Sequence, residues 1–291
     1  MRIANKLLIG SLSLVFSGVI ITSGLLWYQG ATESSESLTN RTEERLTVTR
    51  QLLGQDLRSA RDTLENLTRT LSEAGATRTA LDSFAQGFAE YRTTDVPPSL
   101  RQYYETGFLD TYQDANPDAT LRSNTLLDGM SGRARALQTD YIADNPEALG
   151  EKDKMERAGA ITLYDVTHGR WHQTFRAFQK NFGLYDVFLV DAETDAIVYS
   201  VFKEIDFGTS LTSGPFADSG IAEAYQRAMA TGEPSATTLT DYAPYTPSYG
   251  ARASFIASPI AIDGEIAGAL IFQAPITTFD EIMTVGGQWQ D

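Results

Sequence analysis

The pattern of hydrophobic and polar residues divides the chain into an apolar N-terminal run, a helical region and a β-rich region. The apolar run, LLIGSLSLVFSGVIITSGLLWYQ, occupies residues 7–29, carries no charge and ends with Trp27 and Tyr28. At about 1.5 Å per residue it reaches roughly 33 Å, enough to cross the hydrocarbon core of a membrane. A signal peptide is the alternative, but its apolar region is only about 7–15 residues long. We therefore expect a transmembrane helix at 7–29.

Charged residues flank this run asymmetrically. Arg2 and Lys6 precede it, whereas Glu33 and Glu36 follow it. The positive-inside rule then leaves residues 1–6 in the cytoplasm. The expected location is the inner (cytoplasmic) membrane, with a single pass and the bulk of the chain in the periplasm.

A heptad stripe of apolar residues follows, with charged residues at most other positions. Its members are Leu46, Leu53, Leu57, Ala60, Leu64, Leu67 and Leu71. One interpretation is a helix packed on its own domain, and the other is a stalk that also pairs with a second protomer. A helix from Ser35 to Ala74 would be about 60 Å long, more than a compact domain needs. This length favours a contribution to a homodimer.

Residues 33–150 are predicted to form this long helix and a helical subdomain. AGAT at 74–77 and VPPS at 96–99 are helix breakers. Two helical stretches follow, at about 99–115 and 119–143. The segment NPEALGEKD is a turn-rich linker, and residues 163–182 again repeat apolar positions at helical spacing.

The period changes at residue 185. Five β-rich segments follow, namely YDVFLVD, AIVYSVF, ATTLTDYAPY, ASFIASPIAI and IAGALIFQAPI. Asp263-Gly264 is a two-residue hairpin signal between the last two segments. A loop and one helix at 204–230 separate the second segment from the third. The predicted fold class is α+β, with a five-stranded antiparallel PAS-like sheet in a domain at 151–285 that is covered on both faces.

Charge and composition exclude several classes of function. The net charge is −15, which is unfavourable for binding nucleic acid. The chain has no cysteine, so it has no disulfides, thiolate metal sites or cysteine nucleophile. His168 and His172 are the only histidines, and they lack the HExxH motif and an evident third ligand. With no GxSxG motif either, we expect no enzyme activity in this chain, no metal and no cofactor.

The best candidates for a ligand site lie at the ends of the predicted strands. In DYAPYTPSYGAR, at 241–252, prolines restrict the backbone that carries three tyrosines, and an arginine can clamp a carboxylate or phosphate. The predicted ligand-binding residues are Lys203, Asp206, Tyr242, Tyr245, Tyr249, Arg252 and Gln273. The expected ligand is a small anionic or zwitterionic molecule whose apolar or ring-shaped part lies on tyrosine. The alternative is structural, with tyrosines that cap the sheet and an arginine that pairs with a surface acid.

Four phrases of the sequence resemble a known family. They are LGEKDKM, YDVFLVDAETDAIVYSVFKEIDFGTSL, GPFADSGIAEAYQRA and APYTPSYGARASFIASPIAIDGEIAGALIFQAPI. They resemble the extracytoplasmic Cache-type (PAS-like) sensor of methyl-accepting chemotaxis proteins and related transmembrane receptors, over about residues 141–283. The resemblance implies the ligand-sensing region of a membrane-anchored signal-transduction receptor, first of all a methyl-accepting chemotaxis protein. The alternatives are the sensor of a membrane nucleotide cyclase or histidine kinase, or a membrane-anchored scaffold that senses nothing.

The sequence departs from the family pattern in two ways. It lacks the Asp, Arg, Trp-Tyr and distal Asp constellation by which many Cache sensors hold an amino acid, so the resemblance implies no ligand class. It also ends at GGQWQD, without the second span, HAMP segment or methylated bundle of similar receptors. We expect residues 286–291 to begin a missing downstream region.

Overall fold

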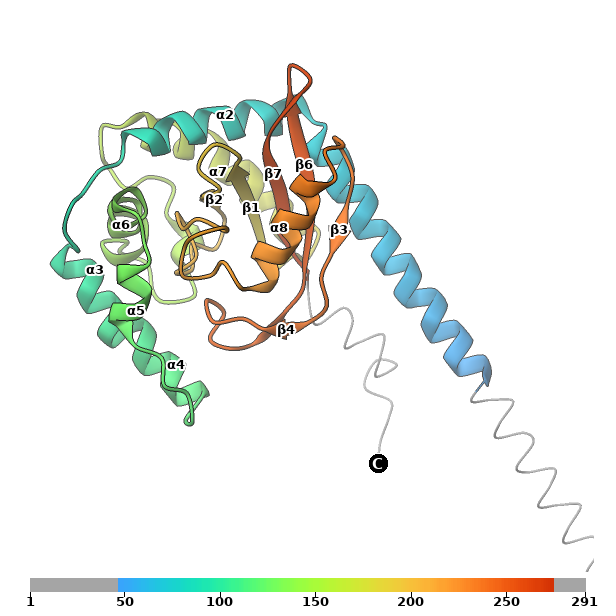
Figure 1. Ribbon diagram of the computed structural model, residues 1–291, viewed down its shortest axis with the longest axis horizontal. Helices are drawn as coiled ribbons and strands as arrows, with labels where there is room; N and C mark the ends of the chain where they lie inside the picture. Colours follow the sequence, from blue (N-terminus) through green and yellow to red (C-terminus); the bar gives the residue numbers. More distant parts are fainter. Residues whose placement is uncertain (1–46, 275–291) are drawn as a thin grey trace, which may run out of the picture. The chain divides into compact units, whose positions relative to one another are not determined.

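The computed structural model describes residues 47–274 (Figure 1). Within these residues, no helix combines the length and the apolar character that a membrane span requires. The predicted fold class included an N-terminal transmembrane helix and is corrected on this point, because no described helix meets that requirement. The run at 7–29 that suggested the span lies outside the described residues, as do 1–6 and 286–291. The fold is α+β with a five-stranded antiparallel sheet.

The chain divides into two compact units, Met1–Arg58 and Ser59–Asp291. In the first unit, residues 47–58 are helical, and Val48 and Leu52 are 48% and 56% exposed. In the second unit, residues 59–72 are helical, and Leu64, Leu67 and Leu71 pack against the core. This part of the predicted heptad stripe therefore faces the domain's own core, and pairing with a second protomer stays a prediction. Leu46 lies outside the described residues.

Short helices form most of the segment between 75 and 154, as the breakers and polar linkers predict. They are α2 (Gly75–Glu90), α3 (Pro98–Gln102), the π-helix η1 (Tyr103–Phe108), α4 (Leu109–Ala115), α5 (Ser123–Asp128), α6 (Gly132–Gln138), the π-helix η2 (Thr139–Ala143) and the 3₁₀-helix η3 (Lys152–Lys154). The predicted stretches 99–115 and 119–143 are helical but interrupted. Single π-turns of this kind are frequent at functional sites.

The sheet has the five predicted strands in the order β2-β1-β7-β6-β3, with every neighbouring pair antiparallel. The strands are β1 (Asp186–Asp191), β2 (Ile197–Ser200), β3 (Thr238–Leu239), β6 (Phe255–Ile262) and β7 (Glu265–Gln273). Asp263 and Gly264 both have positive φ, 52° and 87°, as the predicted hairpin between β6 and β7 requires. A separate small hairpin joins β4 (Ala243–Pro244) to β5 (Arg252–Ala253).

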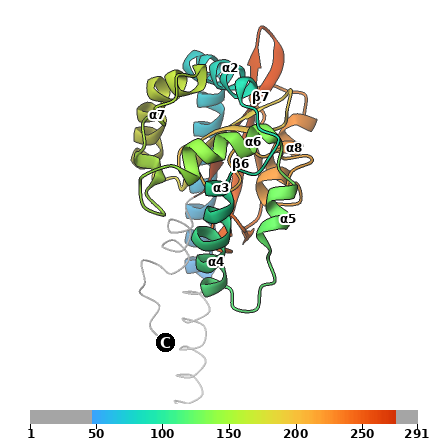
Figure 2. The same ribbon diagram turned by 90° about the vertical axis from the view of Figure 1, so that its left-hand side faces the viewer.

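Helices cover both faces of the sheet, as predicted from its apolar strands. On one face lie α2 and α7 (Leu163–Asn181), and the ring of Phe178 in α7 lies 5.6 Å from that of Phe272 in β7. On the other lies α8 (Gly220–Ala230), which packs on β6 and β7. Figure 2 shows α7 and α8 on opposite sides of these strands. The sheet is therefore the centre of the main hydrophobic core.

A second, smaller core lies among the short helices between α3 and α6. It contains Leu100, Tyr104, Phe108 and Leu127, and it also takes in Ile205 from the loop after β2. The Gln138 amide nitrogen donates to the carbonyl oxygens of Ile205 and Phe207, at 2.8 and 2.6 Å. The loop after β2 is thus held directly by the helical subdomain.

Candidate functional site

A cavity of about 170 Å³ lies where the helical subdomain meets the end of β2. The helical side contributes Tyr103 and Phe108 from η1 together with the segment 149–152. The sheet side contributes the segment 202–205 and the loop that carries Pro247 and Tyr249. The cavity is therefore lined by short helical turns on one side and by loops on the other, and not by the strands of the sheet.

The two sheet-side loops reach the cavity through backbone conformations that few side chains adopt. Lys203 and Tyr249 have φ of 61° and 55°, in the left-handed region. Gly250, with φ of 80°, has no alternative, since a Cβ there would lie 2.6 Å from the side-chain oxygen of Asn116. Non-glycine residues in this region cost about 1–3 kcal/mol and cluster at functional sites. The contacts around Lys203 and Tyr249 must offset this cost in order to hold both residues in place.

Asp186, at the start of β1, organises the turn that carries Lys203. Its carboxylate accepts hydrogen bonds from the backbone N–H groups of Val201 and Phe202, at 2.9 and 3.0 Å, and from the Ser200 hydroxyl at 2.7 Å. Burial raises the pKa of Asp186 to about 7, although the Ser200 hydrogen bond opposes this shift. This carboxyl group therefore titrates near neutral pH.

The Lys203 side chain is 1% exposed, and its Nζ donates to the carbonyl oxygen of Val201 at 3.0 Å. Burial lowers the pKa of Lys203 to about 7, and the charge of Asp186 acts in the opposite direction. A buried ammonium group with one carbonyl partner is poorly solvated. An anionic group in the cavity would stabilise its charged form.

Two further carboxyl groups lie on the same loop. Tyr185 and Ser248 each donate a 2.8 Å hydrogen bond to the carboxylate of Glu204, and the Tyr245 hydroxyl donates to that of Asp206. Burial, followed by the charge of Asp206, raises the pKa of Glu204 well above its usual value. Burial also raises the pKa of Asp206 to about 6, against the Tyr245 hydrogen bond.

Hydrogen bonding in this cluster is incomplete. Among the described residues, one buried oxygen of Asp206 (Oδ1) and one of Gln273 (Oε1) have no hydrogen-bond partner. The amide nitrogen of Gln273 does donate, to Ser248 Oγ at 3.2 Å. Buried polar atoms without partners are rare in folded proteins, and each needs an explanation. Protonation of Asp206, favoured by its raised pKa, would remove the cost of burying a charged oxygen there.

The helical side of the cavity is aromatic and carries a second lysine. The Nζ atom of Lys152 lies 5.2 Å from the centre of the Tyr103 ring and donates to the carbonyl oxygen of Ile142 at 2.7 Å. The rings of Phe108 and Tyr249 lie 5.3 Å apart. Burial raises the pKa of Tyr249 to about 12, so its phenol is neutral. Aromatic faces beside two lysines suit a small molecule with an anionic group.

The structure brings five of the seven predicted residues together. Lys203 and Tyr249 line the cavity, whereas Asp206, Tyr245 and Gln273 are buried behind it. The remaining two, Tyr242 and Arg252, lie at the β4–β5 hairpin, where an exposed Arg252 Nη1 donates to the carbonyl oxygen of Tyr242 at 3.0 Å. Arg252 pairs with Pro244 in that hairpin and does not line the cavity.

Sequence reasoning did not select four residues of this site. Asp186 carried a usable signal, because it is a charged residue at the start of an otherwise apolar strand. Glu204 lies between two predicted residues, but acidic residues are too frequent in this chain for its position alone to be a signal. Tyr103 and Lys152 come from segments about 100 and 50 residues upstream of the loop after β2, and no local pattern indicated that they approach it.

The two histidines are buried in the contact between α7 and its neighbours, with their rings stacked 4.3 Å apart. The ring nitrogens of His172 contact the Tyr199 hydroxyl at 2.9 Å and the carbonyl oxygen of Asp153 at 2.7 Å. Burial, with help from the charge of Lys203, lowers the pKa of His172 to about 3. Within residues 47–274, no group of three or more His, Cys, Asp or Glu residues is placed to hold a metal ion.

No protein-family model matches the chain, and no curated protein matches it. Among solved structures, it is similar to the sensor domain of the histidine kinase DctB of V. cholerae, with 13% identity, a TM-score of 0.32, and coverage of 65% of this chain and 61% of that one. It is also similar to the ligand-binding domain of the Campylobacter jejuni chemoreceptor Tlp3 in complex with L-valine, with 12% identity, a TM-score of 0.27, and coverage of 78% and 66%. The chain thus spans less than two thirds of the length of these structures. Because the TM-scores are this low, function is inferred from the site and not from these likenesses.

Proposed function

We propose that this chain is the ligand-sensing domain of a signal-transduction receptor and that it binds a small anionic or zwitterionic molecule in the cavity beside Lys203. The observation that carries this proposal is a cavity walled by two lysines and several aromatic rings. At about 170 Å³ the cavity is below the usual range of about 300–1,000 Å³ for drug-sized ligands. It therefore suits a small metabolite.

The charges of the cavity define the kind of ligand. An anionic group of the ligand would pair with Lys203 or Lys152, whose Nζ atoms have only backbone carbonyl acceptors among the described residues. An ammonium group, if present, would be accepted by Glu204. The rings of Tyr103 and Tyr249 would hold the apolar part. The proposal is one of binding without catalysis.

Binding would couple the helical subdomain to the sheet. The loop after β2 forms one wall of the cavity and is bonded to the helical subdomain through Gln138 and through the Tyr104 hydroxyl, which lies 3.3 Å from the carbonyl oxygen of Ile205. A ligand shifts a conformational equilibrium only through different affinities for the two states. A molecule that contacts both η1 and this loop would bind two conformations with different affinities if the distance between η1 and the loop differs between them.

The choice among receptor classes rests on the sequence resemblance alone. It favours a methyl-accepting chemotaxis protein that senses its ligand outside the cytoplasm, ahead of a histidine kinase or a nucleotide cyclase. Sequencing the encoding locus beyond the codon for Asp291 tests this choice. A methylated signalling bundle supports the chemotaxis assignment, whereas a kinase or cyclase domain replaces it.

A thermal-shift screen of the full chain against amino acids, small organic acids and aromatic acids tests binding, because a ligand of the native state raises stability by mass action. We expect at least one molecule to raise the melting temperature. Lys152→Met and Tyr249→Ala should each remove most of that shift. Arg252→Ala is the matched control, since Arg252 lies outside the cavity, and it should keep the shift. Equal shifts in all four proteins would place the binding site elsewhere.

A further inference from the structure

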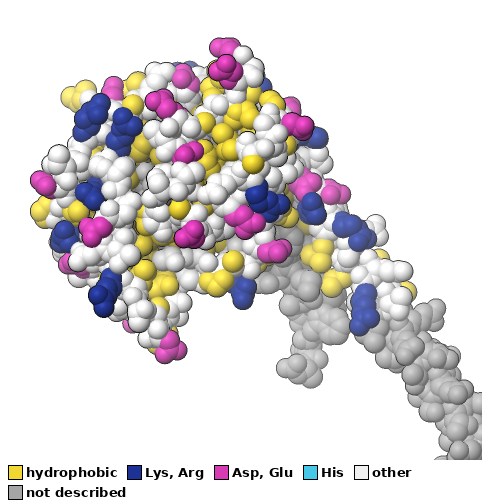
Figure 3. Space-filling view, viewed as in Figure 1, with side chains coloured by type: hydrophobic (Ala, Val, Ile, Leu, Met, Phe, Trp, Pro, Cys, Tyr) yellow, Lys and Arg dark blue, Asp and Glu magenta, His cyan; other side chains and the backbone are white. Residues whose placement is uncertain are grey.

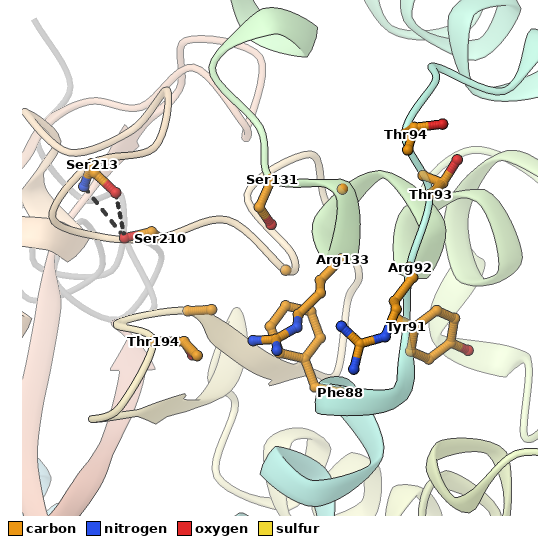
Figure 4. A pocket seen from close by; sticks show the side chains of 13 residues that line it. Phe88, Tyr91, Arg92, Thr93, Thr94, Ser131, Arg133, Thr194, Ser210 and Ser213 are labelled. Atoms are coloured by element: carbon orange, nitrogen blue, oxygen red, sulfur yellow. Dashed lines mark hydrogen bonds between the residues drawn. The ribbon is translucent and has the colours of Figure 1, made fainter.

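A larger cavity of about 620 Å³ lies elsewhere, where the segment after α2, the start of α6 and the loop at 208–213 meet (Figure 4). Its lining consists of Phe88, Tyr91, Arg92, Thr93, Thr94, Ser131, Gly132, Arg133, Thr194, Ala196, Gly208, Ser210 and Ser213. Two arginines and a set of hydroxyl groups therefore share this space with two aromatic rings. It shares no lining residue with the cavity beside Lys203, and we call it the arginine pocket.

The charge of the arginine pocket is opposite to that of the chain. The chain has a net charge of −15, yet no acidic residue within 47–274 lines this pocket. On the face drawn in Figure 3, acidic and basic side chains are instead interspersed. A pocket that contains only positive charge in an acidic protein favours an anionic partner.

Neither arginine is paired within the described part of the chain. Other arginines have carboxylate partners, such as Arg176 with Asp153 at 2.7 Å and Arg227 with Glu223 at 3.1 Å. Among residues 47–274, Arg92 and Arg133 make no ion pair and no side-chain hydrogen bond that the structure records. Both guanidinium groups thus keep all their donors available.

Two acidic residues that share a neighbouring pocket with Arg92 make other hydrogen bonds. Glu90 and Asp140 line a neighbouring pocket that Arg92 also reaches, but not the arginine pocket. Asp140 accepts a 3.0 Å hydrogen bond from the Tyr91 hydroxyl, and Glu90 accepts one from the backbone N–H of Leu163 at 3.4 Å. The positive charge of the arginine pocket is therefore not neutralised by these neighbours through direct contact.

In Figure 4 the guanidinium groups of Arg92 and Arg133 point toward the same end of the pocket, near Phe88, although they come from different elements. Like charges that converge in this way repel each other, and an anion between them removes the repulsion. The planar guanidinium group is well suited to bidentate contact with carboxylate or phosphate oxygens.

Two glycines hold the walls of the arginine pocket close together. A Cβ atom on Gly132 would lie 2.1 Å from the carbonyl oxygen of Thr93, so only glycine lets the segment after α2 approach the start of α6. Gly208 has φ of 80°, and a Cβ there would lie 3.2 Å from the Cα atom of Ala134. The pocket is thus formed by close backbone packing and not by a chance gap between side chains.

We infer that the arginine pocket binds a small organic oxyanion, a carboxylate or a phosphate, whose oxygens contact both Arg92 and Arg133. Its hydroxyl groups, including that of Ser131, supply neutral hydrogen bonds, and Phe88 contacts the carbon skeleton. The volume of about 620 Å³ lies within the range of about 300–1,000 Å³ that is usual for metabolite sites. This site is independent of the one beside Lys203, so either can fail without the other.

Isothermal titration of the full chain tests this inference with two series of probes, dicarboxylates of increasing length and phosphate monoesters. We expect one series to bind, with an affinity that falls as salt concentration rises. Arg92→Gln and Arg133→Gln should each weaken that binding at least tenfold, and the double variant should abolish it. Arg227→Gln is the matched control on an exposed arginine and should bind as the unmodified chain does.

Each result of the titration either identifies the ligand class or overturns the inference. If dicarboxylates alone bind, the ligand class is carboxylate, and if phosphate esters alone bind, it is phosphate. No binding in either series overturns the inference, and so does binding that survives in the double variant. Lys152→Met should leave the titration unchanged, so a loss of binding there would assign the anion to the cavity beside Lys203 instead. Circular dichroism confirms that each variant is folded.

Discussion

The cavity beside Lys203 and the arginine pocket use charge in opposite ways. In the first, burial brings the pKa values of Lys203 and Asp186 to about 7, and their hydrogen bonds fix the loop after β2. In the second, Arg92 is exposed and Arg133 half-buried, and neither has a recorded partner among the described residues. We therefore expect the buried charges to affect stability as well as the proposed binding, and the two arginines to affect the proposed binding alone.

The largest effect is expected at Asp186. Asp186→Ala removes the acceptor for the buried N–H groups of Val201 and Phe202 and for the Ser200 hydroxyl. Each buried donor left without a partner costs about 1–3 kcal/mol. We expect the free energy of unfolding, measured by urea denaturation, to fall by about 3 kcal/mol or more. Asp118→Ala, at an exposed acid, is the control and should change it by less than about 0.5 kcal/mol. A loss below about 1 kcal/mol at Asp186 would contradict this account.

The next largest effect is a dependence of stability on pH. The pKa of Asp206 is raised from 3.8 to about 6 in the folded state. Its protonated form therefore contributes fully to the free energy of unfolding below about pH 4, and this contribution is lost as pH rises through about 6. This contribution is on the order of 3 kcal/mol, and the raised pKa of Glu204 acts in the same direction. Asp206→Asn should therefore flatten the fall of the unfolding free energy between pH 4 and 6.

The contribution of Lys203 to the free energy of unfolding changes with pH in the opposite direction and over a different pH range. Its pKa is lowered from 10.5 to about 7 in the folded state, so its contribution is present above pH 10.5 and is lost as pH falls through 7. We expect the free energy of unfolding to rise between pH 7 and 10, and Lys203→Met to remove this rise. An unchanged profile in Lys203→Met would mean that the lysine is charged in the folded protein at every pH in this window.

The smallest effect on stability is expected at the arginine pocket. Arg92→Gln and Arg133→Gln remove charges that make no recorded contact within residues 47–274, so each should change the free energy of unfolding by less than about 0.5 kcal/mol. The same urea titration measures it. A loss above about 1.5 kcal/mol in either variant would show that the arginines have a structural role, and the contrast between the two regions would disappear.

Local patterns predicted the sheet well and the sites only in part. The strands, the hairpin at Asp263-Gly264 and the covering helices follow from alternation and turn chemistry, which act over a few residues. The walls of the cavity beside Lys203 could not be predicted in the same way, because Tyr103 and Lys152 approach the loop after β2 only through tertiary packing. Arg252 was predicted together with Lys203 and Tyr249, but it lies in the β4–β5 hairpin and does not line this cavity.

The arginine pocket had no signal in the sequence. Arg92 and Arg133 are separated by 41 residues, lie in unremarkable polar segments and match no motif. Only the close approach that Gly132 allows brings their segments together. Sites formed by residues distant in sequence, without a motif, are recognised only from the folded chain.

Hydrogen exchange of the full chain, with and without the molecule that gives the largest thermal shift, tests the central claim most directly. If that molecule binds between the helical subdomain and the sheet, exchange should slow in three segments, 103–108, 203–207 and 247–250. Segments 91–94 and 208–213, at the arginine pocket, should be unchanged. Protection confined to 91–94 and 208–213, or no protection in the first three segments, would contradict the claim that the cavity beside Lys203 is the sensing site.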